Sequence, residues 1–106
     1  MIMREFISVA NEDIQKGIIR EIGAKGFVII EVIAAYADFD TRQAIVSIET
    51  IANKTGMSYT TATRVINGLV ERGYITKQII PTRVGLRPLF KILDDRFELI
   101  RIEDED

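Results

Sequence analysis

The sequence contains no cysteine, no histidine and no tryptophan. Without cysteine there can be no disulfide, no thiolate nucleophile and no cysteine-based zinc or iron–sulfur site. Without histidine the chain lacks the commonest general base and the commonest metal ligand. The carboxylates that remain gather near the ends of the chain and in turns, where they do not face one another across an element. We therefore expect a protein that is not an enzyme and that uses no metal or other cofactor.

Long apolar runs are absent as well. No uninterrupted run reaches the roughly 18 to 20 residues that span a membrane, and the opening residues MIMREF do not resemble a signal peptide. We expect a cytoplasmic protein with no membrane partner. The 106 residues, 47% apolar and 28% charged, are typical of a single soluble domain with one core.

Positive charge is concentrated in one part of the chain. The net charge of the whole chain is −2. Residues 1–40 carry four basic and seven acidic side chains, and residues 94–106 carry two basic and seven acidic ones. The middle segment, residues 41–93, carries eight basic and two acidic side chains, which gives it a net charge of +6. This segment has the electrostatic character that binding to a phosphate backbone requires.

The first half of the chain predicts two helices and a short strand. Asn11 is a suitable N-cap for a helix of about ten residues that ends near Gly23, because isoleucines recur there at i, i+4 and i+8. Residues 26–37 are apolar on nearly every side; their β-branched first half would also suit a strand, but their length favours a buried helix. A turn at residues 38–41 and a small strand at residues 43–46 follow.

Residues 47–73 predict two short helices joined by a tight turn. Ser47 and Ser58 are N-caps, and Gly56 and Gly73 are helix stops. The apolar side of the second helix carries Ala62, Val65, Ile66 and Leu69. Its other side is polar and free of acidic residues, with Arg64 as its only charge, and it carries Thr60, Thr63, Arg64 and Asn67, with Thr61 beside them. This is the helix-turn-helix arrangement.

A basic hairpin is predicted over residues 74–93. Residues 74–80 and 89–93 have strand composition, and the loop of residues 81–88 between them contains two prolines, Gly85 and two arginines. The prolines suit the ends of strands, where no ladder donor is needed. Together with the preceding helices, this hairpin predicts an α+β fold, a winged helix-turn-helix with three to four helices and a β-hairpin wing.

The two ends of the chain are expected to support this unit. Residues 1–10 form an N-terminal arm, with Phe6 and Ile7 extended, and residues 94–106 form an acidic C-terminal tail. Residues 96–102 alternate loosely and allow an extra strand or a short helix. The apolar residues there pack either on the core or on a partner chain: Phe97, Leu99, Ile100 and Ile102.

The run SIETIANKTGMSYTTATRVINGLVERGYI resembles the winged helix-turn-helix of bacterial replication-initiator and phage replisome-organiser proteins. Ile51 stands where that pattern usually has leucine. Upstream, FISVANEDI and KGFVIIEVIAAYADFD resemble the arm and first long helix of the same family, so the resemblance covers roughly residues 6–80. The stretch TRVGLRPLFKI is similar to the wings of small DNA-binding adaptors in plasmid partition. Replication initiators usually carry a further C-terminal domain, which is missing from this sequence.

These features predict sequence-specific binding to double-stranded DNA. We expect the second helix to enter the major groove, where Arg64 contacts a guanine edge or a phosphate and Asn67 an adenine or a phosphate. The basic wing is expected on the flanking backbone or in the minor groove. The predicted DNA-binding residues are Ser58, Tyr59, Thr60, Thr61, Thr63, Arg64, Asn67, Lys77, Thr82, Arg83, Arg87 and Lys91. Ser58 is more important as a cap than as a contact, and Tyr59 is placed near the core boundary.

The biological setting is open at this level. We expect a homodimer that acts in plasmid or phage replication, in partition or in transcriptional repression, with a replication or partition protein as a possible further partner. The alternative is a winged helix that serves as a protein–protein interaction module, with the acidic tail and the apolar C-terminal segment as its working surface.

Overall fold

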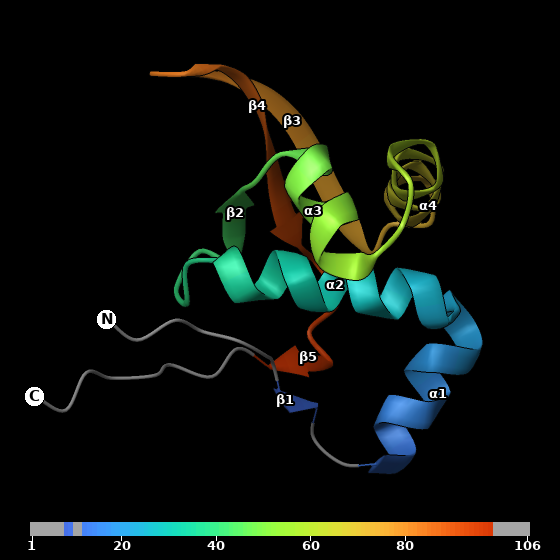
Figure 1. The fold of residues 1–106 in the computed structure, drawn as a ribbon. Coiled ribbons are helices and arrows are strands. Elements are labelled where there is room, and N and C mark those ends of the chain that lie inside the picture. Colours follow the sequence, from blue (N-terminus) through green and yellow to red (C-terminus); the bar gives the residue numbers. More distant parts are fainter. Residues whose placement is uncertain (1–7, 10–11, 99–106) are drawn as a thin grey trace, which may run out of the picture.

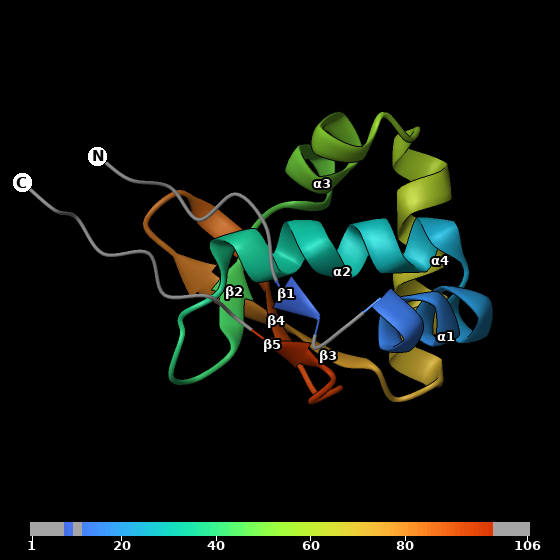
Figure 2. The same cartoon turned by 90° about the horizontal axis from the view of Figure 1, so that it is seen from below.

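The structure is a computed structural model, and it describes residues 8–9 and 12–98. Helix α2 (Ala24–Tyr36) crosses the centre of the domain in both views (Figure 1, Figure 2). Helices α3 (Ile48–Thr55) and α4 (Tyr59–Glu71) lie on one side of it, and α1 (Glu12–Ile22) meets its N-terminal end (Figure 1). The helices predicted from sequence are confirmed, and Asn11, the expected cap of α1, lies outside the described residues.

Helix α2 forms the centre of the core. It contacts α1, α3, α4 and two strands, so a helix in this place must be apolar on most of its sides. Ile29, Ile30 and Ile33 are fully buried. The strand alternative for this segment is therefore wrong, because the length of the segment and its burial on most sides prevail over the β-branched composition of residues 28–33.

A three-stranded antiparallel sheet packs against these helices. Its strands are β2 (Gln43–Ile45), β4 (Gly85–Ile92) and β3 (Ile75–Thr82), in the order β2-β4-β3. The pairing of β3 with β4 runs without a break from Ile75↔Ile92 to Thr82↔Gly85. The last two strands are the predicted hairpin, and the α+β winged-helix architecture is confirmed.

The hairpin loop predicted at residues 81–88 is wrong. Both strands continue into it, and only Arg83 and Val84 connect them. Pro81 and Pro88 are paired residues of the ladder, opposite Leu86 and Ile79. Pro81 is tolerated because β3 is an edge strand, and Pro88 because β2 pairs with β4 only from Leu89 to Lys91. On the side facing away from the hairpin partner, neither proline therefore has a neighbouring strand that would need a backbone N–H from it.

A second, two-stranded sheet joins the ends of the chain. β1 (Ser8–Val9) pairs with β5 (Phe97–Glu98), which confirms an extra strand within residues 96–102. Phe97 is fully buried, and its ring lies 5.5 Å from that of Phe27 in α2. For Phe97 the core alternative is therefore the correct one. Phe6, Ile7, Leu99, Ile100 and Ile102 lie outside the described residues.

Gly26 marks the closest approach between helices. A Cβ at this position would overlap Cγ2 of Ile22 in α1 and lie 3.2 Å from Cδ2 of Leu69 in α4. Three helices therefore meet where one side chain is missing, and the close packing depends on that absence.

Gly26→Ala is expected to lower the free energy of unfolding by about 1–3 kcal/mol, because overpacking at this three-helix contact outweighs the gain in helix propensity. Denaturant unfolding followed by circular dichroism measures the change. Gly17→Ala in α1 is the matched control: a Cβ there meets nothing within 4 Å, so we expect no loss and a gain of up to about 1 kcal/mol. Equal effects of the two substitutions would contradict the packing argument.

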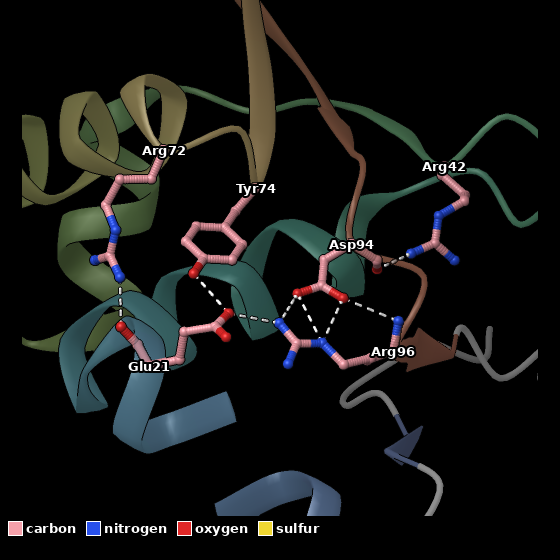
Figure 3. Close-up of polar contacts among 6 residues, drawn as sticks. All are labelled: Glu21, Arg42, Arg72, Tyr74, Asp94 and Arg96. Carbon is pink, nitrogen blue, oxygen red and sulfur yellow. Dashed lines mark hydrogen bonds and ion pairs between the residues drawn. The ribbon is translucent and has the colours of Figure 1, made fainter. Parts of the chain in front are cut away.

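A polar network ties α1, the base of the hairpin and the segment after β4 together (Figure 3). The Glu21 carboxylate accepts hydrogen bonds from the Tyr74 hydroxyl at 2.6 Å and from the Arg96 guanidinium at 2.8 Å. Arg96 also binds the Asp94 carboxylate, at 2.6 Å to Oδ2 and 2.9 Å to Oδ1. Arg72 donates to the Glu21 carbonyl and lies 5.2 Å over the Tyr74 ring.

Arg42 holds the other side of the same segment (Figure 3). Its guanidinium donates to the carbonyls of Ile92, at 3.1 Å, and Asp94, at 2.8 Å. The backbone of Arg42 has φ of 60°, a conformation that residues other than glycine rarely adopt. The bonds from its side chain and from its backbone to Asp38 and Ile92 stabilise this conformation.

Acid is expected to weaken this network. Hydrogen bonding from Arg96 holds the pKa of the Asp94 carboxyl below its ordinary value. The stabilisation by Asp94 is therefore complete above its unfolded-state pKa of about 3.9 and is lost as the pH falls through the lower folded-state pKa. Asp94→Asn should lower the free energy of unfolding by about 1 kcal/mol at pH 7, and this difference should shrink as the pH falls below about 3.9.

Denaturant unfolding of both proteins between pH 7 and pH 2 tests this expectation. Glu31, half-buried on α2, has a pKa raised by burial, so its protonation changes stability in the opposite direction. It is present in both proteins, and its contribution cancels in the comparison. A stability difference that stays constant across the pH range would contradict the assignment to Asp94.

Candidate nucleic-acid interface

The turn between α3 and α4 is built by hydroxyl caps and one glycine. The Ser47 side chain accepts the Thr50 amide at 3.0 Å, and the Ser58 side chain accepts the Thr61 amide at 3.1 Å. Gly56 ends α3 with φ of 74°, in the left-handed region that glycine adopts without strain. Three residues separate the helices, so both predicted caps and the predicted glycine stop are confirmed.

The outer face of α4 forms an open hollow. Its lining residues share one side of the helix, away from the core: Tyr59, Thr60, Thr63, Arg64, Asn67, Gly68 and Glu71. Ala62, Ile66 and Leu69 are buried on the opposite side, as predicted. The expectation of an acid-free face with Arg64 as its only charge is wrong, since Glu71 lies seven residues, or about two turns, after Arg64.

The predicted residues of this face differ in how accessible they are. Arg64, Thr60 and Asn67 are exposed. Tyr59 is 59% exposed, so its placement near the core boundary is wrong. Thr63 Oγ1 is buried and has no hydrogen-bond partner, so Thr63 presents its hydroxyl to a ligand only if its neighbours move.

Ser58 and Thr61 are occupied within the protein. Ser58 Oγ accepts the Thr61 amide and lies 3.0 Å from Thr61 Oγ1. Their hydroxyls therefore shape the start of α4, which makes the capping role the better supported of the two weighed for Ser58.

The wing brings two of its predicted contacts close to the turn. Arg83 is exposed in the turn itself, and Arg87 lies on β4. Thr82 Oγ1 donates to the Gly85 carbonyl at 2.6 Å and accepts the Val84 amide at 3.3 Å. Thr82 is thus a structural residue of the turn, a role that sequence reasoning did not assign to it.

Lys77 and Lys91 are not brought together. Lys77 pairs with Phe90, on the face of the hairpin that packs against the helices, whereas Lys91 pairs with Thr76 on the opposite face. A duplex lying on the helix side of the hairpin can therefore contact Lys77 more readily than Lys91.

A family model described as a helix-turn-helix domain matches residues 20–75, just over half of the chain. The chain belongs to the helix-turn-helix domain family. The match runs from the last turn of α1 to the first residue of β3 and leaves out almost the whole wing. A comparison with curated proteins finds no match.

Membership in the helix-turn-helix domain family supports DNA binding in general terms, and such domains are typically not enzymes. Among residues 8–9 and 12–98, no helix has the length and apolar character needed to cross a membrane.

The basic character of this helix-turn-helix domain is partly used inside the protein. Of the eight basic side chains in residues 41–93, Arg42 and Arg72 donate hydrogen bonds to backbone carbonyls about fifty residues away along the chain, and Arg87 donates one to the carbonyl of its neighbour Leu86. The net charge of +6 therefore overstates what is available to DNA. The basic residues other than Arg42 and Arg72 lie on α3, on α4 and on the wing: Lys54, Arg64, Lys77, Arg83, Arg87 and Lys91.

Proposed function

We propose that this protein binds double-stranded DNA in a sequence-specific manner, with α4 in the major groove and the wing on the flanking backbone or in the minor groove. One observation carries the proposal: a helix-turn-helix domain presents exposed Tyr59, Thr60, Arg64 and Asn67 along one open face of its second helix. A helix of this kind fits the major groove, which is about 12 Å wide.

The side chains of this face match the groups that base edges offer. Arg64 can bind the O6 and N7 acceptors of guanine, and Asn67 can bind N6 and N7 of adenine. Glu71 can accept from the N4 amine of cytosine but repels phosphates. The face thus has donors and acceptors suited to reading bases, with its positive charge limited to one residue.

Affinity on this proposal comes largely from the wing. Arg83 and Arg87 lie at or beside its turn, and Lys77 faces the helix side. Contacts of this kind neutralise phosphates and release counterions, so affinity falls steeply as salt rises.

The test is selection of bound duplexes from random-sequence DNA, followed by a gel-shift titration of the recovered duplex at several salt concentrations. We expect enrichment of one sequence and binding that weakens with salt. Absence of salt-sensitive duplex binding would refute the proposal, and binding without sequence enrichment would refute its specificity. A palindromic consensus would support action as a homodimer, because operator symmetry mirrors protein symmetry.

The finer role that we propose is plasmid or phage replication or partition, or transcriptional repression, in the cytoplasm. It is supported by the resemblance of residues 6–80 to replication-initiator domains and of the wing to partition adaptors. The alternative, a protein-interaction module built on the C-terminal segment, loses one of its expected apolar contacts, because Phe97 is buried within the domain itself.

A further inference from the structure

The wing exposes apolar side chains where a solvated turn would be expected. Val84 is 71% exposed and Leu86 is 67% exposed, and these are the two most exposed large apolar residues of the described chain. Ile79, farther down the hairpin, is 53% exposed. A hairpin tip needs no such residues for its own folding, so their exposure points to a partner.

The strand register places Leu86 and Ile79 on the helix side of the wing. On β4, Leu86 lies on the same face as Phe90 and Ile92, which are buried against the core. Across the ladder, Pro81 pairs with Leu86 and Ile79 with Pro88 on that face. Ile79, Pro81 and Leu86 thus form an apolar stripe that continues the buried face of the hairpin. This stripe is exposed to solvent where the hairpin projects past α3 (Figure 1).

The tip is held in one shape. The ladder is paired up to Thr82↔Gly85, and the Thr82 hydroxyl bonds to both the Gly85 carbonyl and the Val84 amide. Val84 and Leu86 are therefore presented by a rigid turn, and binding pays little to order them.

The charge around the stripe selects the partner. From Arg72 to Leu93 the chain has five basic residues and no acidic one. Arg83 precedes Val84 directly, and Arg87 follows Leu86. The minor groove of DNA combines anionic walls with sugars and base edges that accept apolar side chains, so it complements both features.

We propose that Val84 and Leu86 form an apolar wedge that enters the minor groove and opens a base step, while Arg83 and Arg87 hold the flanking phosphates. The wedge rests on the proposed DNA binding. The minor groove is about 6 Å wide, which is too narrow for a two-stranded hairpin with its side chains. Entry of the tip therefore widens the groove and bends the duplex, as apolar wedges do in architectural proteins.

The test uses the full chain and a duplex recovered by selection from random DNA. The duplex carries a fluorescence energy-transfer pair at its ends, and 2-aminopurine is placed in turn at each step of the wing-side flank. We expect the protein to increase energy transfer, because bending brings the duplex ends closer together. We also expect it to raise 2-aminopurine fluorescence several-fold at the one base step that the wedge opens. Val84→Ser together with Leu86→Ser should abolish both signals and weaken binding about tenfold, with the salt dependence unchanged.

Leu93→Ser is the matched control, because Leu93 is 46% exposed at the opposite end of the hairpin. It should leave both signals intact. Salt-sensitive binding without unstacking, or signals that survive the double serine change, would overturn the wedge and leave DNA binding standing. A dimer in sedimentation that the double serine change dissociates would assign the stripe to a second copy and would also overturn it. A protein that binds no duplex at all would overturn the proposed function and the wedge together.

Discussion

Arg64→Ala is expected to weaken binding to the selected duplex by roughly 10- to 100-fold, which corresponds to about 1–3 kcal/mol, and to relax preference at one base position. The side chain is exposed in the middle of the α4 hollow, with Asn67 and Glu71 on the same face. A bidentate contact with guanine is lost completely when the guanidinium is removed, and no neighbouring cation on this face can replace it. Gel-shift titration on the selected duplex and on its single-base variants measures both effects.

Arg20→Ala is the matched control for charge. Arg20 is an exposed arginine in the last turn of α1, so its removal changes the net charge equally and leaves the α4 face intact. We expect it to have little effect on base preference. A loss for Arg64→Ala that is uniform over all sequences would instead assign Arg64 to a phosphate.

The wing change should have a different signature. Arg83→Ala combined with Arg87→Ala is expected to weaken binding to all sequences alike. It should also reduce the slope of log affinity against log salt by about the amount that two phosphate contacts contribute. Both side chains lie at or beside the turn, and neither replacement disturbs the Thr82 hydrogen bonds that shape it. The measurement is the slope of log affinity against log salt on the selected duplex and on a scrambled one.

An unchanged salt slope in the double variant would contradict a phosphate-binding wing. A change in base preference would mean that the wing also reads sequence. Lys91→Ala is the matched control, because Lys91 is exposed on the same outer face of β4 as Arg87 but lies at the base of the hairpin, away from the turn. We expect it to change the slope least among the basic residues of the wing.

The parts of this fold that sequence predicts are those that local chemistry decides. Ser47, Gly56 and Ser58 set helix ends through contacts a few residues away, and the structure has these contacts as expected. The α+β winged helix follows from these caps, from the apolar faces of the helices and from the strand composition of the hairpin. The wing turn was mispredicted because proline and glycine preferences are local, whereas the ladder partner decides whether a strand continues.

The candidate site depends more on distant contacts. Arg42 and Arg72 contribute to the net charge of +6 that the sequence assigns to residues 41–93. In the structure their side chains donate hydrogen bonds to carbonyls about fifty residues away along the chain. Glu71 was recoverable, since it lies four residues after Asn67 on the same helical face. The exposed apolar wing tip could not be predicted from the sequence, because only the strand register reveals which face of the hairpin Leu86 occupies. The DNA contacts assigned to individual residues stay predictions.

Gly73 is the only residue between two anchored ones, Arg72 and Tyr74, and both of these are bound to Glu21. The end of α4 and the start of the wing are therefore held to one point on α1. On the proposed mode of DNA binding, this fixes the spacing between the bases that α4 would read and the segment that the wing would hold. One base pair inserted between these two DNA segments would move the wing's segment by roughly 3.4 Å along the DNA axis and about 35° around it. Because the connection between α4 and the wing is fixed at both Arg72 and Tyr74, we expect that the wing cannot follow this movement.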